Sequence, residues 1–126
     1  MAHPRSVALK SATILVATVI LCLSSCHLFY QDFPDELQGR WEYDDGSHYE
    51  WFVIDRDELY YCKCRINYGT IEDERTMYLR SCDESAGQLS TTDLYLLYRW
   101  EGNQLSFAYG EDGFPSSPEW KDVHPY

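Results

Sequence analysis

The stretch LQGRWEYDDGSHYEWFVI, residues 37–54, decides the fold. It holds two aromatic-rich runs in which apolar and polar residues alternate, with Asp45-Gly46 between them. Asp-Gly between two such runs is the strongest short-range signal for a β-hairpin, because glycine adopts the positive φ that a tight turn requires. Residues 58–66 follow the short turn 55–57 and supply a third strand. The sequence therefore predicts an antiparallel meander.

The rest of the chain continues as short strands separated by turns. We expect strands over residues 76–82, 92–100 and 104–109, and a short closing strand over 119–123. No segment has the 3.6-residue periodicity of an amphipathic helix, and the sequence contains no internal repeat. Six or seven short strands at near-regular spacing predict an all-β sandwich or an up-and-down barrel. Closing the barrel would remove exposed strand edges.

The first 25 residues have the pattern of a secretory signal peptide, which we expect as a helix preceding the barrel. Arg5 and Lys10 precede an uncharged apolar run, residues 12–23. This run is shorter than the roughly 20 apolar residues that a spanning helix needs, so cleavage is favoured over a permanent anchor.

The end of this run, Leu23-Ser24-Ser25-Cys26, resembles the lipobox of bacterial lipoproteins. The resemblance implies that cleavage makes Cys26 the first residue and that its thiol carries a diacylglycerol group, with fatty acids such as palmitate. Ordinary secretion with a free Cys26, or an uncleaved anchor, are the alternatives. The next residue is His27, not the Asp that retains some lipoproteins at the inner membrane, so the prediction leans towards the outer membrane of a bacterial cell envelope.

The expected organisation is a signal peptide over residues 1–25, a tether over 26–36 and one barrel domain over 37–126. Pro34 and its acidic neighbours have the composition of a linker. Beyond the signal peptide, eight basic residues face 21 acidic ones, a formal net charge of −13. Nucleic acid is therefore disfavoured as a partner, because phosphate recognition relies on Lys and Arg clusters. Attachment to a membrane would depend on lipid at Cys26.

The start of the first strand, Gly39-Arg40-Trp41, resembles the G-x-W signature of lipocalin-like domains. The hairpin YRWEGNQLSF, residues 98–107, is similar to the ending of many small lipocalin-like lipoproteins. The resemblance spans residues 37–123 loosely and implies a lipocalin-like barrel. In it Trp41 would close one end, and Gly39 would let the chain pass close beneath the Trp41 ring. The domain is shorter than a full lipocalin, and side chains can fill an eight-stranded interior.

Three cysteines remain for the exported domain if Cys26 carries lipid. Cys62 and Cys64 face the same side of one strand, about 6.6 Å apart along the chain, which is awkward for a direct bridge. Because disulfides form readily outside the cytosol, we expect Cys82 to pair with Cys62 or with Cys64. A Cys₃His metal set with His48 is the alternative, but C-x-C within a strand is not the spacing of structural zinc sites. No metal is predicted.

Catalytic motifs are absent from the sequence, so we expect no enzyme activity and no cofactor. His48 and Glu50 share a strand face and could act as a base and its orienter, but a solvated strand face is the simpler interpretation. The acidic segments 55–58 and 72–74 lack the EF-hand pattern, and we predict that they are solvated turns.

Aromatic side chains supply the candidate binding surface, namely Tyr49, Trp51, Tyr60 and Tyr61. One face of these strands must be core, and the other is either a binding surface or a surface covered by loops. The predicted function is a non-enzymatic, membrane-anchored lipoprotein module that holds a small apolar ligand or a protein partner.

The alternative is an acidic protein inhibitor of a lysozyme-like enzyme, for which Ser85-Ala86-Gly87 is a poor match to the Ser-Gly motif of known inhibitors. An open apolar interior would favour ligand binding, whereas a filled core with a protruding acidic or aromatic loop would favour a protein partner.

Overall fold

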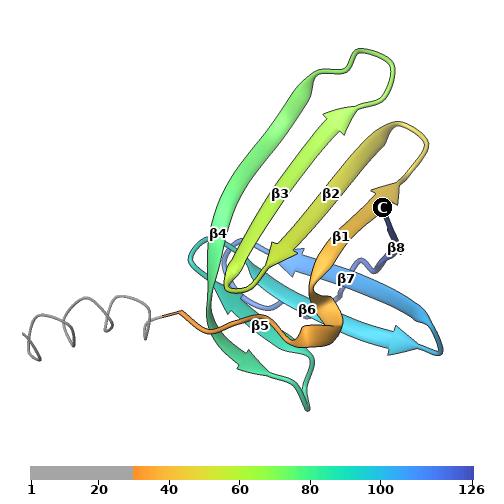
Figure 1. The fold of residues 1–126 in the computed structure, drawn as a ribbon. Coiled ribbons are helices and arrows are strands. Elements are labelled where there is room, and N and C mark those ends of the chain that lie inside the picture. Colours follow the sequence, from red (N-terminus) through yellow and green to blue (C-terminus); the bar gives the residue numbers. More distant parts are fainter. Residues whose placement is uncertain (1–29) are drawn as a thin grey trace, which may run out of the picture.

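The computed structural model describes residues 30–126, so the predicted signal peptide and the lipidation site at Cys26 lie outside the described residues. Within that range, eight antiparallel strands pair in chain order and the last pairs with the first, which closes a barrel (Figure 1). The strands are β1 (Gly39–Asp44), β2 (His48–Asp55), β3 (Glu58–Arg65), β4 (Ile71–Asp83), β5 (Gln88–Thr91), β6 (Tyr95–Glu101), β7 (Gln104–Gly110) and β8 (Lys121–Pro125).

The predicted small antiparallel barrel is confirmed, but two strand assignments need correction. The acidic segment 72–74 is not a turn: it lies inside β4, which begins at Ile71 and runs for 13 residues. Half-buried Asp73 and Arg75 alternate there with the exposed Glu74, and all three pair with β3, so the strand continues despite its charge. The sequence also gave no strand for β5, whose four residues are too few to show an alternating pattern.

The first hairpin forms where Asp45-Gly46 predicts it. Asp44 pairs with Tyr49, and the carboxylate of Asp45 accepts hydrogen bonds from the backbone N–H groups of Ser47 and His48. These bonds from Ser47 and His48 lower the pKa of Asp45 to about 2. The Asp45 side chain therefore stabilises the turn, in addition to the positive φ that Gly46 supplies.

The long strand β4 connects the two halves of the barrel. Its first part pairs with β3 and its last part pairs with β5, with a shift of register between Leu79 and Ser81. A bulge of this kind bends a strand and lets it turn a barrel corner. Figure 1 shows the result: β1 to β4 stand side by side and cross the direction of β6 and β7.

Side chains fill the barrel interior. Phe52 and Phe107 lie with ring centroids 5.0 Å apart at its centre, and Tyr61 packs against Phe52 at 5.2 Å. Leucines from β3 to β7 and Met77 surround these rings, as an eight-stranded barrel permits. The core is therefore of the filled type, in which the apolar rings themselves occupy the space that a ligand would need.

One end of the barrel is plugged by the segment that precedes β1. Phe33 is only 1% exposed, and Leu37, in the short 3-10 helix η1 (Asp35–Leu37), is fully buried. The Phe33 N–H donates to the carbonyl of Arg56, 2.8 Å away in the β2–β3 turn. The expected tether over 26–36 is therefore wrong from Phe33 onwards, because apolar burial outweighs the linker-like composition.

Trp41 and Gly39 lie beside this plug. The Trp41 indole N–H donates to the Leu37 carbonyl at 2.9 Å, and the ring packs against the core and edge-on against Trp100. Gly39 does not serve a close approach to the ring, since a Cβ there would meet nothing within 4 Å. Its φ of +122° explains the glycine instead, because other residues rarely adopt that backbone conformation.

The expected disulfide from Cys82 to Cys62 or Cys64 is wrong, because within residues 30–126 these three cysteines are free thiols. In the register of β3 and β4, Cys62 lies opposite Glu74. Cys82 is eight residues further along β4 and beyond its bulge, which at about 3.3 Å per residue is roughly 25 Å of strand from the position opposite Cys62. The Cys₃His alternative fails for the same reason.

Candidate functional site

The alternation of β2 and β3 sorts the predicted aromatic surface into two sides. Phe52 and Tyr61 lie opposite one another on β2 and β3 and belong to the core, so they point inwards. Tyr49, Trp51 and Tyr60 occupy the alternate positions and point outwards. Tyr49 and Trp51 stack along β2 with centroids 5.8 Å apart. Three of the four predicted residues thus share the outer face. The assignment of Tyr61 to that surface is a misprediction, because Tyr61 belongs to the interior.

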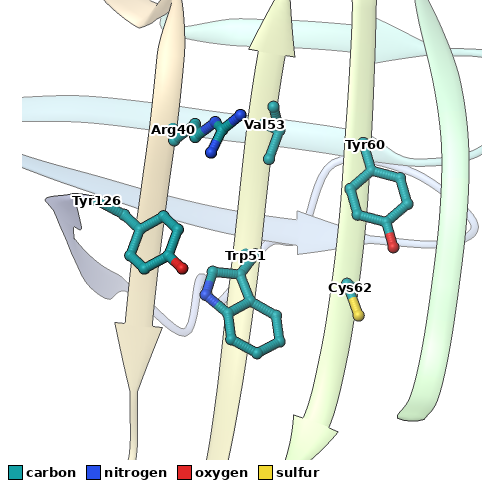
Figure 2. A pocket seen from close by; sticks show the side chains of 6 residues that line it. All are labelled: Arg40, Trp51, Val53, Tyr60, Cys62 and Tyr126. Carbon is teal, nitrogen blue, oxygen red and sulfur yellow. The ribbon is translucent and has the colours of Figure 1, made fainter.

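A shallow, open groove of about 460 Å³ lies on this outer face of β1 to β3, and we call it the outer groove. The residues that line it are Arg40, Trp51, Val53, Tyr60, Cys62 and Tyr126. Figure 2 shows Trp51, Tyr60 and Tyr126 with their broad ring faces towards the viewer, above the strands that carry the first two. The floor of the groove is therefore aromatic and nearly flat.

The polar atoms of the outer groove favour a ligand that accepts hydrogen bonds. Its lining carries the guanidinium of Arg40, the indole N–H of Trp51 and two tyrosine hydroxyls. No Asp or Glu is among the six lining residues, and the nearby carboxylate of Glu74 contacts Tyr60 and Cys62. The Nε1 atom of Trp51 is buried and has no hydrogen-bond partner within residues 30–126. A buried donor without a partner costs about 1–3 kcal/mol. An acceptor brought by a ligand would remove that cost.

Burial keeps Tyr60 and Cys62 of the outer groove neutral. Burial, together with contacts to Cys62 and Glu74, raises the pKa of Tyr60 to about 12. Burial also raises the pKa of the Cys62 thiol, which is 5% exposed, and the carboxylate of Glu74 adds to this effect. Since the thiolate is the reactive form of cysteine, Cys62 lines the groove as an apolar group and not as a nucleophile.

A second polar cluster lies inside the barrel, opposite the plugged end. The Glu50 carboxylate accepts hydrogen bonds from Lys121 Nζ at 2.6 Å, from the Tyr109 hydroxyl at 2.6 Å and from the Tyr61 hydroxyl. Burial opposes ionisation of Glu50, but these three donors outweigh it and hold the pKa of the carboxyl below its ordinary value of 4.5. The Lys121 ammonium also faces the rings of Tyr43 and Tyr109. All acceptors and donors of this cluster are thus already paired with one another.

His48 and Glu50 do not form the base and orienter that their spacing allows. The Nε2 atom of His48 lies 3.0 Å from the carboxylate of Glu72, which also binds Arg65. Glu50 is engaged by Lys121 instead. His48 and Glu50 therefore contact different partners.

The β3–β4 hairpin presents exposed apolar side chains beside acidic ones. Tyr68 at its turn is 74% exposed, and Ile71 at the start of β4 is also exposed. Glu72 follows, and through His48 it is connected to Asp45 of the neighbouring β1–β2 turn. This end of the barrel, which we call the acidic end, combines an exposed aromatic ring with negative charge.

Ser85-Ala86-Gly87 is tied into the barrel. The Ser85 hydroxyl donates to Asp83 at 2.6 Å, and the Gly87 carbonyl accepts from the Tyr98 N–H at 2.9 Å. A Cβ at Gly87 would lie 2.3 Å from the Tyr98 carbonyl oxygen, so a glycine is required at this position. The motif is therefore explained by the β4–β5 turn.

In the part of the chain that the structure describes, no three His, Cys, Asp or Glu side chains gather closely enough to hold a metal ion. None of the helices in residues 30–126 has the length and apolar character to cross a membrane. Comparisons with protein-family models, with curated proteins and with solved structures each gave no match.

Sequence reasoning found the aromatic strands of the outer groove but missed three of its features. Arg40 lies in the groove because β1 pairs with β2 and Arg40 is opposite Val53. Tyr126 lies there because its N–H donates to the Arg40 carbonyl. Cys62 was considered only as a disulfide partner or a metal ligand. The predicted hairpin of β2 and β3 could have indicated this role, because it places Cys62 opposite Trp51 and residues opposite one another share a face.

Proposed function

We propose that this protein is a non-enzymatic binding module, anchored to a bacterial membrane by lipid on Cys26, that takes its ligand in the outer groove. The groove differs from a lipocalin-like ligand site in one respect, because the ligand would lie outside the barrel wall.

The observation that carries this proposal is the contrast between the two faces of β2 and β3. On the inner face Phe52, Tyr61 and their neighbours fill the barrel. On the outer face the aromatic residues border an open groove, in which the Trp51 indole N–H has no hydrogen-bond partner among the described residues. Ligand sites commonly have volumes of about 300–1,000 Å³ and combine aromatic walls with a few polar groups. The volume and lining of the outer groove fit that description.

The lipid anchor has its own test. Mass spectrometry of the protein purified from its host in mild detergent should show a chain that begins at Cys26 and carries the mass of acyl groups. A Cys26→Ser variant should lose that mass and leave the membrane fraction. A mature protein that begins elsewhere and carries no lipid would contradict the anchor.

The position of the binding site is tested by crosslinking in the host. A photoreactive phenylalanine analogue is placed at Val53 in the outer groove, and at Asp122, which is exposed on β8, as the matched control. We expect an adduct of defined mass from position 53 and none from position 122. Absence of any adduct at 53, or equal adducts at both positions, would contradict the proposal.

The acidic end supports a second candidate, an inhibitor of a basic lysozyme-like enzyme. The filled interior, the net charge and the exposed ring of Tyr68, on the hairpin that also carries Glu72, agree with a surface that enters a positively charged cleft. Electrostatic attraction of this kind accelerates association and weakens with salt.

A lysozyme activity assay with the purified domain tests this candidate. Inhibition should fall with added salt and should be lost in Tyr68→Ala, whereas Tyr60→Ala in the outer groove should inhibit normally. Full lysozyme activity at every concentration of the domain would exclude the inhibitor function.

A further inference from the structure

We propose that the outer groove binds a neutral oligosaccharide, whose sugar rings stack on Trp51 and Tyr60. This inference rests on the proposed function, because it names the ligand class of the same groove.

The shape of the groove floor favours ring-shaped ligands. Trp51 and Tyr60 come from neighbouring strands and present their broad faces outwards (Figure 2). Tyr49 extends the same surface along β2, at a centroid distance of 5.8 Å from Trp51 and an interplanar angle of 20°. The face of an aromatic ring is electronegative, and the C–H bonds on the face of a sugar ring complement it. A row of such faces therefore suits a chain of sugar rings.

The hydrogen-bonding groups around this floor match the edges of a sugar. Trp51 Nε1 needs an acceptor, and Arg40 forms no ion pair within the described residues. Sugar hydroxyl and acetamide oxygens are acceptors of this kind. Because Nε1 is buried, a side chain of the groove must move before a ligand oxygen can reach this atom, and we expect the exposed Tyr126 of the groove lining to do so.

Three other ligand classes fit less well. An extended peptide cannot add as a strand at the middle of the outer groove, because β2 already pairs along its length with β1 on one side and β3 on the other. An acyl chain would leave the donors of the groove unpaired and, in an open groove, would remain exposed to water. A polyanionic glycan would be repelled by the net charge of −11.

Calorimetric titration of the domain, residues 26–126, with chitohexaose tests the proposal, and cellohexaose shows what the acetamide groups contribute. We expect saturable binding of chitohexaose that quenches tryptophan fluorescence. Tyr60→Ala should weaken binding by about two- to tenfold, because it removes one stacking ring. Tyr68→Ala, whose ring is exposed at the acidic end, is the matched control and should bind normally.

Trp51→Phe separates the role of the indole N–H from folding. The variant keeps an aromatic ring and removes the buried donor without a partner, so its melting temperature should be equal to or above that of the wild type. Its affinity for chitohexaose should nevertheless fall. Loss of affinity together with loss of melting temperature would assign Trp51 a structural role and overturn its role in binding.

The outcomes distinguish the two proposals. No binding of chitohexaose at millimolar concentration, or binding unchanged by Tyr60→Ala and Trp51→Phe, overturns the sugar inference. If position 53 still crosslinks to a polypeptide in the host, the outer groove remains the binding site and only the ligand class is wrong. If position 53 gives no adduct and chitohexaose does not bind, both proposals fail.

Discussion

The ammonium of Lys121 on β8 lies 2.6 Å from the carboxylate of Glu50 on β2, across the interior of the barrel. Glu50 is 1% exposed, and Lys121 also donates to the Tyr109 hydroxyl at 3.0 Å. The pair connects the closing strand to the first hairpin. Because β8 has only five residues, this contact adds to the few backbone hydrogen bonds that close the barrel.

Replacing Lys121 with alanine should destabilise the protein strongly. The substitution leaves a buried carboxylate without its cation, and breaking a buried ion pair in this way costs about 3–5 kcal/mol. Urea unfolding measures the loss. Glu101→Ala, which removes the exposed partner of Arg99, is the control and should cost no more than about 1 kcal/mol. Equal losses of unfolding free energy for the two substitutions would show that the buried pair stabilises the protein no more than the exposed one.

The same pair predicts how stability depends on acid. The pKa of Glu50 in the folded protein lies below 4.5, its ordinary value in the unfolded chain. The stabilisation is therefore fully present above about pH 4.5 and is lost as the pH falls through the folded pKa. In urea unfolding at a series of pH values, the wild type should lose more stability in this acid range than Glu50→Gln. Parallel pH profiles would contradict the assignment.

Gly87→Ala should be much more harmful than Gly102→Ala. Both glycines have φ near +60°, so both alanines carry the same backbone strain of about 1 kcal/mol. At position 87 the added methyl would also lie 2.3 Å from the Tyr98 carbonyl oxygen, whereas the space at position 102 is open. Thermal unfolding should show a clearly larger fall in melting temperature for Gly87→Ala. Equal falls in melting temperature would mean that the β4–β5 turn can shift to accommodate the added methyl group without cost.

Phe33→Ala tests whether the barrel domain begins before β1. The ring is buried at the plugged end, and removing a buried phenylalanine costs about 3–5 kcal/mol. The neighbouring Asp32→Ala, at an exposed position, should change the free energy of unfolding by less than about 0.5 kcal/mol. A Phe33→Ala variant as stable as the wild type would support the sequence prediction, in which the tether extends to residue 36.

The thiols provide a chemical test of the fold. Burial raises the pKa of both Cys62 and Cys82, but Cys82 is the more exposed of the two. Iodoacetamide should therefore modify Cys82 before Cys62 in the native protein, and should modify both quickly in urea. Peptide mass spectrometry without prior reduction reads out the sites. A peptide that joins Cys82 to Cys62 or Cys64 would contradict the register of β3 and β4.

The strand pattern of residues 37–66 was predictable because alternation and Asp45-Gly46 act locally. The short β5 and the acidic start of β4 were not, since both depend on partners elsewhere in the barrel. Gln88–Thr91 becomes a strand because it pairs on both sides, with β4 and β6. Tertiary pairing outweighs local composition in both cases.

The candidate site was predictable only in part. Alternation identifies Tyr49 and Trp51 as residues of one face, but it does not decide which face of β3 is core. Tyr60 and Tyr61 are adjacent and chemically identical, and only the packing of Tyr61 against Phe52 assigns the inner side. The contact of Lys121 with Glu50 spans 71 residues, and no local pattern indicates it.

The plugged end has a mechanical consequence for a domain attached through Cys26. A pull on such an anchor enters the described chain at Tyr30, which stacks on Tyr78 of β4, and next reaches Gln31, whose N–H binds the Leu79 carbonyl. Phe33 then has to leave its buried position before tension reaches β1. With an anchor at Cys26, we therefore expect these contacts to break before tension reaches the strands that carry the outer groove.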